Sequence, residues 1–234
     1  MGVGAVVVVG VAINEAIGEE PAMAVIGFDL DGTLVDSVAD IAAALNEALA
    51  VVGLAPHAVD VIRDFVGDGA RVLVDLALQA HDSDVDVDVV LRHFRDAYAR
   101  DPIGKTAAFA GIDDVLDALH QHTLVVVTNK PGDFARTIVE ALFPGRFALV
   151  VGPDDLGCFK PDPWVLKEVA YRVGAPVAVF IGDSENDVAV ARSVGAHAVG
   201  VTWGLRPEQA RLADVVVDDV TQLGATILGL LSVS

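Results

Sequence analysis

Short apolar runs alternate with segments of helical periodicity over most of the chain. Continuous Val, Ile and Leu runs such as 124–127 and 177–181 predict strands that are buried on both faces. From residue 111 onward such runs alternate with helical patterns, an order typical of parallel β-α-β units. We therefore predict an α/β fold, a Rossmann-like parallel sheet flanked by helices. The predicted strands cover 24–28, 124–127, 148–151, 177–181, 197–201 and 215–217, and the predicted helices 112–120, 134–142, 164–173, 188–194 and a last segment from about 221.

Residues 38–107 interrupt this alternation, because they contain helical patterns and no strand pattern. The predicted helices cover 38–52, 59–65, 71–80 and 87–100, and Gly53 is a suitable stop for the first of them. The sequence therefore predicts an all-α helical cap at 38–107, inserted after the first strand. The α/β core domain then comprises 23–37 and 108–234, and residues 1–22 form an N-terminal extension.

The extension begins with an apolar run, Val3 to Ile13, that is too short to span a bilayer and has no basic residue before it. We expect neither a membrane anchor nor a signal peptide. Two alternatives remain for this segment. Met23 directly precedes the first predicted strand and could be the natural start, or the run could add an edge strand to the sheet.

The chain is strongly acidic, with a formal net charge of −19 that is spread along its length. This charge argues against nucleic acid or an anionic membrane as a partner. Cys158 is the only cysteine, which excludes an intrachain disulfide and fits a reducing cytoplasm. An anionic substrate would need local positive charge, so the few lysines near strand ends are informative.

Two acidic residues follow the first predicted strand, in the segment FDLDGTLVDS at 28–37. Asp29 and Asp31 are two positions apart, so in extended geometry both side chains point to the same side, and Gly32 permits the bend that follows. Buried acids of one sign need a cation or a proton. Taken alone, however, Asp-x-Asp is equally typical of a solvated strand end.

Polar residues also follow the other predicted strands, and in an open parallel sheet the carboxyl ends of the strands surround the ligand. Asp29 and Asp183 can supply the carboxylates that Mg²⁺ prefers, since this ion is commonly held by one or two carboxylates. Asp187 is better placed to hold a metal-bound water or Lys160 than to bind the metal directly. By themselves, Asp183 and Asp187 are more typical of a helix N-terminus than of a metal site. The residues expected at this edge are Asp29, Asp31, Thr128, Asn129, Lys130, Lys160, Asp183 and Asp187.

Four segments together resemble the motifs of the haloacid dehalogenase (HAD) superfamily: residues 28–37, Thr128-Asn129-Lys130, Lys160-Pro-x-Pro and the Gly-Asp-Ser-x-x-Asp string at 182–187. The resemblance implies that Asp29 is a phosphoryl-accepting nucleophile and Asp31 the general acid and base. It further implies that Asp31 binds Mg²⁺ through its backbone carbonyl, that the Thr128 hydroxyl binds phosphate, and that Lys160 neutralises the phosphoryl charge.

Within the superfamily the chain resembles the phosphoglycolate phosphatase branch. The loop at 66–73 is similar to the Gly-x-Gly-x-x-x-Leu loop whose cap residues face the substrate in that branch, and a helix-helix turn would look the same in sequence. The resemblance predicts that Asn129, Lys130 and Arg71 bind substrate, with the Arg71 guanidinium holding the carboxylate of phosphoglycolate.

The expected function is that of a Mg²⁺-dependent phosphatase acting on a small phosphorylated metabolite, most simply 2-phosphoglycolate, through an aspartyl-phosphate. We expect a cytoplasmic monomer or homodimer. The alternatives are a β-phosphoglucomutase-like phosphotransfer and hydrolysis of another sugar phosphate, a nucleotide or pyrophosphate. A dehalogenase would not need Asp31, a phosphonoacetaldehyde hydrolase would need a lysine within 38–104, and a regulatory binding module would have lost a charged motif residue.

Overall fold

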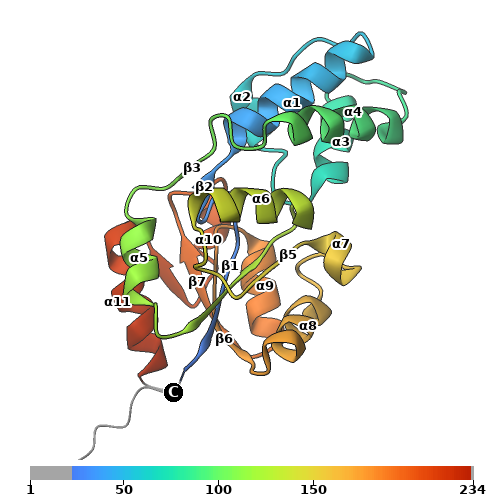
Figure 1. Cartoon of the computed structure of the whole chain (residues 1–234). Coiled ribbons are helices and arrows are strands. Elements are labelled where there is room, and N and C mark those ends of the chain that lie inside the picture. The colour runs from blue at the N-terminus through green and yellow to red at the C-terminus, as the bar shows by residue number, and fades with distance from the viewer. Residues whose placement is uncertain (1–22, 233–234) are drawn as a thin grey trace, which may run out of the picture.

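The computed structural model describes residues 23–232 and centres on a six-stranded parallel sheet (Figure 1). Its strands are β1 (Val25–Phe28), β4 (Thr123–Val127), β5 (Leu149–Val151), β6 (Val177–Gly182), β7 (His197–Val201) and β8 (Val215–Val217). They lie in the order β5-β4-β1-β6-β7-β8, and every neighbouring pair is parallel. The predicted parallel sheet is confirmed, whereas the predictions for residues 1–22 lie outside the described residues.

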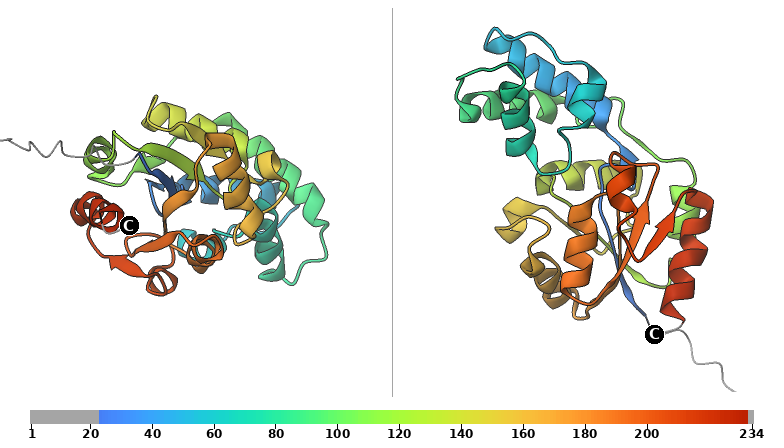
Figure 2. Two further views of the ribbon diagram at one scale, coloured as in Figure 1. Left: turned by 90° about the horizontal axis from the view of Figure 1, so that it is seen from below. Right: turned by 180° about the vertical axis from the view of Figure 1, so that it is seen from behind.

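Helices cover both faces of this sheet (Figure 2). One face packs against α5 (Ile112–Ala118), α6 (Gly132–Leu142) and α11 (Val220–Leu231), and the other against α8 (Pro163–Val173) and α9 (Glu185–Ser193). Successive residues of β4 alternate between the two faces of the sheet. Val126 belongs to the apolar cluster on the first face, and Val125 and Val127 belong to the cluster on the other face. Burial on both faces is the physical reason why the strands read as continuous apolar runs. Two one-turn helices, α7 (Pro153–Leu156) and α10 (Pro207–Ala210), complete this part of the chain.

Two of these helices, α8 and α11, begin at an aspartate. The side chains of Asp162 and Asp219 accept hydrogen bonds from the backbone N–H groups of Trp164 and Thr221 at the starts of α8 and α11. Such caps satisfy backbone donors that have no partner within the helix. Part of the chain's acidity therefore defines where its helices start. No helix between residues 23 and 232 is both long enough and apolar enough to cross a membrane.

Four helices pack together beyond the carboxyl edge of the sheet (Figure 1). They are α1 (Val38–Val51), α2 (Val59–Arg63), α3 (Ala70–Gln79) and α4 (Val87–Arg100), and they share an apolar cluster of their own. Phe134 of α6 also belongs to this cluster, whereas Ile138 of the same helix packs against the sheet. Helix α6 thus connects the two apolar cores, and the division into cap and core at 38–107 stays our prediction.

A second, two-stranded antiparallel sheet lies where the chain enters and leaves the four helices. It pairs β2 (Val35–Asp36) with β3 (Ala107–Ala108). Next to it, the buried Asp40 carboxylate accepts hydrogen bonds from the backbone N–H groups of Lys105 and Thr106 and from the Thr106 hydroxyl, at 2.7–3.0 Å. We did not predict this sheet, because two-residue strands are too short to show a periodic pattern. The two-stranded sheet joins the segment that enters the four helices to the segment that leaves them.

Candidate active site

The end of β1 places Asp29 beside β6. The Asp29 N–H donates to the carbonyl oxygen of Ile181 at 2.8 Å, which continues the β1–β6 pairing by one residue. The chain then turns through Gly32, whose φ is +87°, and a Cβ atom at this position would collide with the Asp183 carboxylate. Glycine is therefore required both by the backbone conformation and by the close approach of the acid.

Lys160 joins two of the predicted acids. Its ammonium lies 2.7 Å from a carboxylate oxygen of Asp29 and 2.7 Å from one of Asp187, and the residue is only 4% exposed. Burial acts to lower the pKa of this ammonium, but Asp187 and Asp29 together raise it above its ordinary value, so the lysine remains charged. Asn129 fixes the loop, because its side-chain oxygen accepts a hydrogen bond from the Lys160 N–H at 2.8 Å.

Asp187 combines the two roles that the sequence left open. One carboxylate oxygen accepts hydrogen bonds from the Ser184 hydroxyl at 2.6 Å and the Ser184 N–H at 3.0 Å, closing a capping box at the start of α9. The other oxygen accepts from Lys160. The helix start thereby holds Asp187 in the orientation that binds the lysine.

Three buried carboxylates form a cluster that could hold a metal ion. One oxygen from each of Asp29, Asp183 and Asp187 lies within 4.8 Å of the others. Burial raises the pKa of Asp29 to about 6, although Lys160 opposes this. Burial also raises the pKa of Asp183 to about 8, and the neighbouring Asp29 and Asp187 add to the effect. A single ammonium leaves negative charge in excess among these oxygens, and such a donor set fits a hard cation.

Asp31 has a separate set of partners. The Lys130 ammonium lies 3.1 Å from each of its two carboxylate oxygens, and the Ser37 hydroxyl donates to one of them at 2.5 Å. Burial acts to lower the pKa of Lys130, but Asp31 and Tyr98 outweigh it, and the pKa lies above its usual range. Sequence reasoning missed Ser37, although it belongs to the first motif, and Tyr98, which is distant in the chain.

A pocket lies between the carboxyl edge of the sheet and the four-helix cluster. The wall formed by the sheet is polar, and the wall formed by the helices is largely apolar. Thr128 lies on the polar wall, and its hydroxyl oxygen accepts a hydrogen bond from the Lys130 N–H at 3.2 Å. The polar wall comprises Asp29, Asp31, Thr128, Asn129 and Lys130, and the opposite wall includes Ile41, Val66, Leu73, Phe94 and Tyr98.

The structure does not bring Arg71 to this pocket, contrary to the prediction. Its side chain is 60% exposed and pairs with Asp88 of α4. Leu73 lines the pocket, and two residues along a helix differ in direction by about 200°, so Arg71 faces away. Arg71 follows the predicted loop directly, as the second residue of α3, and the direction of its side chain depends on how α3 packs.

Three residues of the α/β part hold the loop that precedes α3, and the sequence did not point to them in this role. Arg206 donates to the carbonyl oxygen of Val66 at 2.8 Å and to the Asp68 carboxylate at 3.2 Å. Asn186 donates to Asp68 at 2.6 Å, and the Asn129 amide donates to the carbonyl oxygen of the intervening glycine at 3.2 Å. Only the folded chain brings these segments together.

Comparisons with known proteins agree with this geometry. The family model described as haloacid dehalogenase-like hydrolase matches residues 26–201. A phosphoglycolate phosphatase of Pseudomonas fluorescens (strain Pf0-1) is 37% identical over 209 residues, covering 84% of this chain and 76% of the relative. One of Agrobacterium fabrum (strain C58) is 36% identical, covering 84% and 88%.

Solved structures agree as well. A crystal structure of a predicted phosphoglycolate phosphatase from Haemophilus somnus 129PT superposes with a TM-score of 0.79 at 28% identity, covering 88% of this chain and 98% of that one. The match to the family model includes all four motif segments. The chain belongs to the haloacid dehalogenase-like hydrolase family and is an enzyme of its phosphatase type.

Proposed function

We propose that the protein is a Mg²⁺-dependent phosphatase that hydrolyses small phosphate monoesters, with 2-phosphoglycolate as its principal substrate, through an aspartyl-phosphate. One observation carries the proposal. Two acids, two residues apart, line one pocket and have different cationic partners: Lys160 for Asp29 and Lys130 for Asp31. Separate environments allow two chemically identical carboxylates to take different roles.

In the proposed reaction a carboxylate oxygen of Asp29 attacks phosphorus in line with the ester oxygen. Lys160 and the Thr128 hydroxyl bind the non-bridging phosphoryl oxygens as charge develops on them. Asp31 donates a proton to the departing alkoxide, which leaves as an alcohol. Asp31 then accepts a proton from water, and the resulting hydroxide displaces Asp29 from phosphorus to release inorganic phosphate.

The carboxylates of Asp29 and Asp183, with the backbone carbonyl of Asp31, would hold Mg²⁺, and Asp187 would support the site through Lys160. Their excess negative charge fits this cation. When bound, the ion supplies positive charge that neutralises the acids and the phosphoryl oxygens. The residues themselves orient the nucleophile and transfer the proton.

Two findings favour phosphoglycolate among the small phosphate esters. Curated relatives that carry this name are 33–37% identical over most of the chain. In addition, the apolar wall contributed by the helices offers few partners for the hydroxyls of a sugar, and buried hydroxyls without partners oppose binding. We also propose a cytoplasmic monomer or homodimer, a location supported by the single cysteine, Cys158.

The test is a kinetic comparison of the purified protein with Mg²⁺ on phosphoglycolate, sugar phosphates, a nucleotide, pyrophosphate and p-nitrophenyl phosphate. We expect the highest kcat/KM for phosphoglycolate. A higher value for a sugar phosphate would replace the substrate assignment, and inactivity on every ester would overturn the proposed function. Asp29→Asn serves as the inactive control.

A further inference from the structure

Segment 203–206, which follows β7, runs beside one of the acids proposed to bind Mg²⁺. The Leu205 N–H donates to a carboxylate oxygen of Asp183 at 2.5 Å. A Cβ atom at Gly204 would collide with the same carboxylate, so the backbone of the segment packs directly against it. Groups that bind a metal-ligating carboxylate from behind fix its orientation and tune its affinity for the metal. Segment 203–206 therefore orients Asp183.

The side chains at the end of this segment reach the four helices instead. Leu205 packs against the apolar cluster that these helices share. One guanidinium nitrogen of Arg206 donates to the Val66 carbonyl oxygen at 2.8 Å and to the Asp68 carboxylate at 3.2 Å. The Arg206 side chain is 17% exposed, and a Cβ atom at the intervening Gly67 would lie 3.3 Å from its guanidinium carbon. Adjacent residues of one segment thus contact both Asp183 and the loop before α3.

This loop, residues 66–69, forms part of the pocket. Val66, Gly67 and Gly69 line it on the side of the four helices. The loop packs closely against Arg206, and the pair that Arg206 forms with Asp68 is less exposed than the Arg71–Asp88 pair. A charge-assisted hydrogen bond that is partly shielded from water is screened less than an exposed one. The contact with Arg206 therefore has the strength to fix the wall of the pocket.

We propose that segment 203–206 couples cation binding at Asp183 to the position of loop 66–69, with Arg206 as the positioning residue for the loop. This inference rests on the proposed function, because it takes the buried acids to bind Mg²⁺. While Arg206 holds the loop, the neighbouring Leu205 N–H stays on Asp183 and keeps that carboxylate in one orientation. Coupling between two sites is reciprocal, so the fixed loop favours the cation by the same factor by which the cation favours the fixed loop.

Arg206→Ala tests the coupling without removing any of the acids. Calorimetric titration of the full chain with Mg²⁺ gives the Kd in the absence of substrate and turnover. We expect this Kd to rise at least about fivefold, the lower end of typical coupling between sites. Asp68→Ala breaks the same contact from the side of the loop and should also raise the Kd, so the test stands if Arg206→Ala does not fold.

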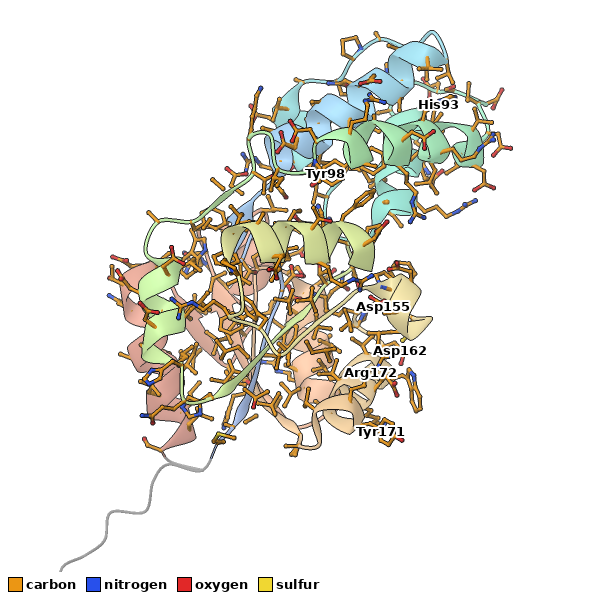
Figure 3. The ribbon with its side chains drawn as sticks, in the orientation of Figure 1. His93, Tyr98, Asp155, Asp162, Tyr171 and Arg172 are labelled. Atoms are coloured by element: carbon orange, nitrogen blue, oxygen red, sulfur yellow. The ribbon has the colours of Figure 1, made fainter. Side chains whose placement is uncertain are left out.

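Arg172→Ala is the matched control. Like Arg206, Arg172 binds one carboxylate and one backbone carbonyl, those of Glu168 at 2.9 Å and Asp155 at 3.0 Å. It lies on α8, away from the four helices (Figure 3). Because the contacts of Arg172 stay within the α/β part, this variant should keep the Kd of Mg²⁺ within about twofold of the parent.

Hydrogen exchange distinguishes coupling from a merely structural contact. In the unmodified protein, Mg²⁺ should slow exchange of the backbone N–H groups of 66–69 at least about fivefold, and in Arg206→Ala less than about twofold. A contact that is only structural would speed exchange in the variant by the same factor with and without Mg²⁺. That result would overturn the coupling, as would an unchanged Kd of Mg²⁺ in both Arg206→Ala and Asp68→Ala.

These measurements need no turnover, which separates this inference from the proposed function. If the Kd and the exchange rates depend on Arg206 as expected but no ester is hydrolysed, the proposed function fails and the coupling stands. If esters are hydrolysed with Mg²⁺ but neither quantity responds to Arg206→Ala or Asp68→Ala, the coupling fails and the proposed function stands. A protein that binds no Mg²⁺ would contradict both.

Discussion

Arg206 donates a hydrogen bond to the Asp68 carboxylate at 3.2 Å and thereby ties the loop before α3 to the α/β part of the chain. Asn186 donates to the same carboxylate, and its neighbour Asp187 binds Lys160. The residue before Arg206 donates its backbone N–H to Asp183 at 2.5 Å. The residues that hold the loop are therefore sequence neighbours of those that shape the candidate active site.

Asp68→Ala should lower kcat about 10- to 100-fold, and to a similar extent on every ester. The change shifts the groups beside Lys160 and Asp183 without removing a contact to the substrate. Displacements of about 1 Å have effects of this size. The measurement is kcat and KM on phosphoglycolate and ethyl phosphate. A loss confined to one of the two esters would contradict this role and would indicate that Asp68 recognises the leaving group.

Arg71→Ala should change kcat/KM less than about twofold, since the Arg71–Asp88 pair is exposed and such pairs contribute little. It is also the control for Asp68→Ala, because it breaks an ion pair near the same loop that does not reach the α/β part. Steady-state kinetics on phosphoglycolate is the measurement. A selective loss on this substrate would return Arg71 to the specificity site.

Asp29→Asn should reduce turnover by at least about 1,000-fold while the protein remains folded, because an amide cannot form the acyl phosphate. Initial rates give the first quantity, and circular dichroism with a thermal melt gives the second. Retention of more than a few per cent of activity would exclude Asp29 as the nucleophile. Asp36→Asn, a change in the same motif at an exposed position, is the matched control.

Removal of divalent cations with EDTA should abolish activity, and Mg²⁺ should restore it, since the buried acids need a cation before they can receive a phosphate. Ca²⁺ should inhibit, because its larger and more variable coordination does not keep Asp29 in line with phosphorus. Rates after dialysis and after each addition test this. Full activity in metal-free buffer would reject the proposed dependence on Mg²⁺.

The pH dependence of stability should reveal the same acids. Asp29 and Asp183 keep their protons up to about pH 6 and about pH 8 in the folded protein, against an ordinary pKa of 3.8. The unfolded chain therefore binds fewer protons than the folded one between about pH 4 and pH 8, and the free energy of unfolding decreases as pH rises through this window.

In EDTA the melting temperature should thus fall between pH 5 and pH 8, and the stabilisation by Mg²⁺ should grow over the same range, because the cation competes with protons for these oxygens. Thermal melts of the protein and of Asp183→Asn, with and without Mg²⁺, are the measurement. The variant should show a smaller fall in EDTA. An equal fall in both proteins would show that other groups control the pH dependence.

The sequence alone determined the parallel sheet and the polar edge at its carboxyl end. Strands buried on both faces read as apolar runs, and the residues that follow them, such as Asp29, Thr128 and Asp183, are local to those runs. Helix starts were predictable to within a few residues, because they too depend on residues that are close together in the sequence. The helix predicted at 87–100 coincides with α4, where Asp86 caps the first turn.

Only the tertiary structure decided which side chains meet across segments that are distant in sequence. Tyr98 and Arg206 lie in different segments from the motifs. No local pattern marks Tyr98 as part of the pocket or Arg206 as a partner of the loop before α3. Arg71 is the converse case, because the sequence suggested it as a pocket residue and the fold does not bring it there. Its position directly after the loop is a property of the sequence, but the packing of α3 turns Leu73 toward the pocket and Arg71 toward solvent. Periodicity reports which face of a helix is buried, and the global packing decides which residue of that face reaches the substrate.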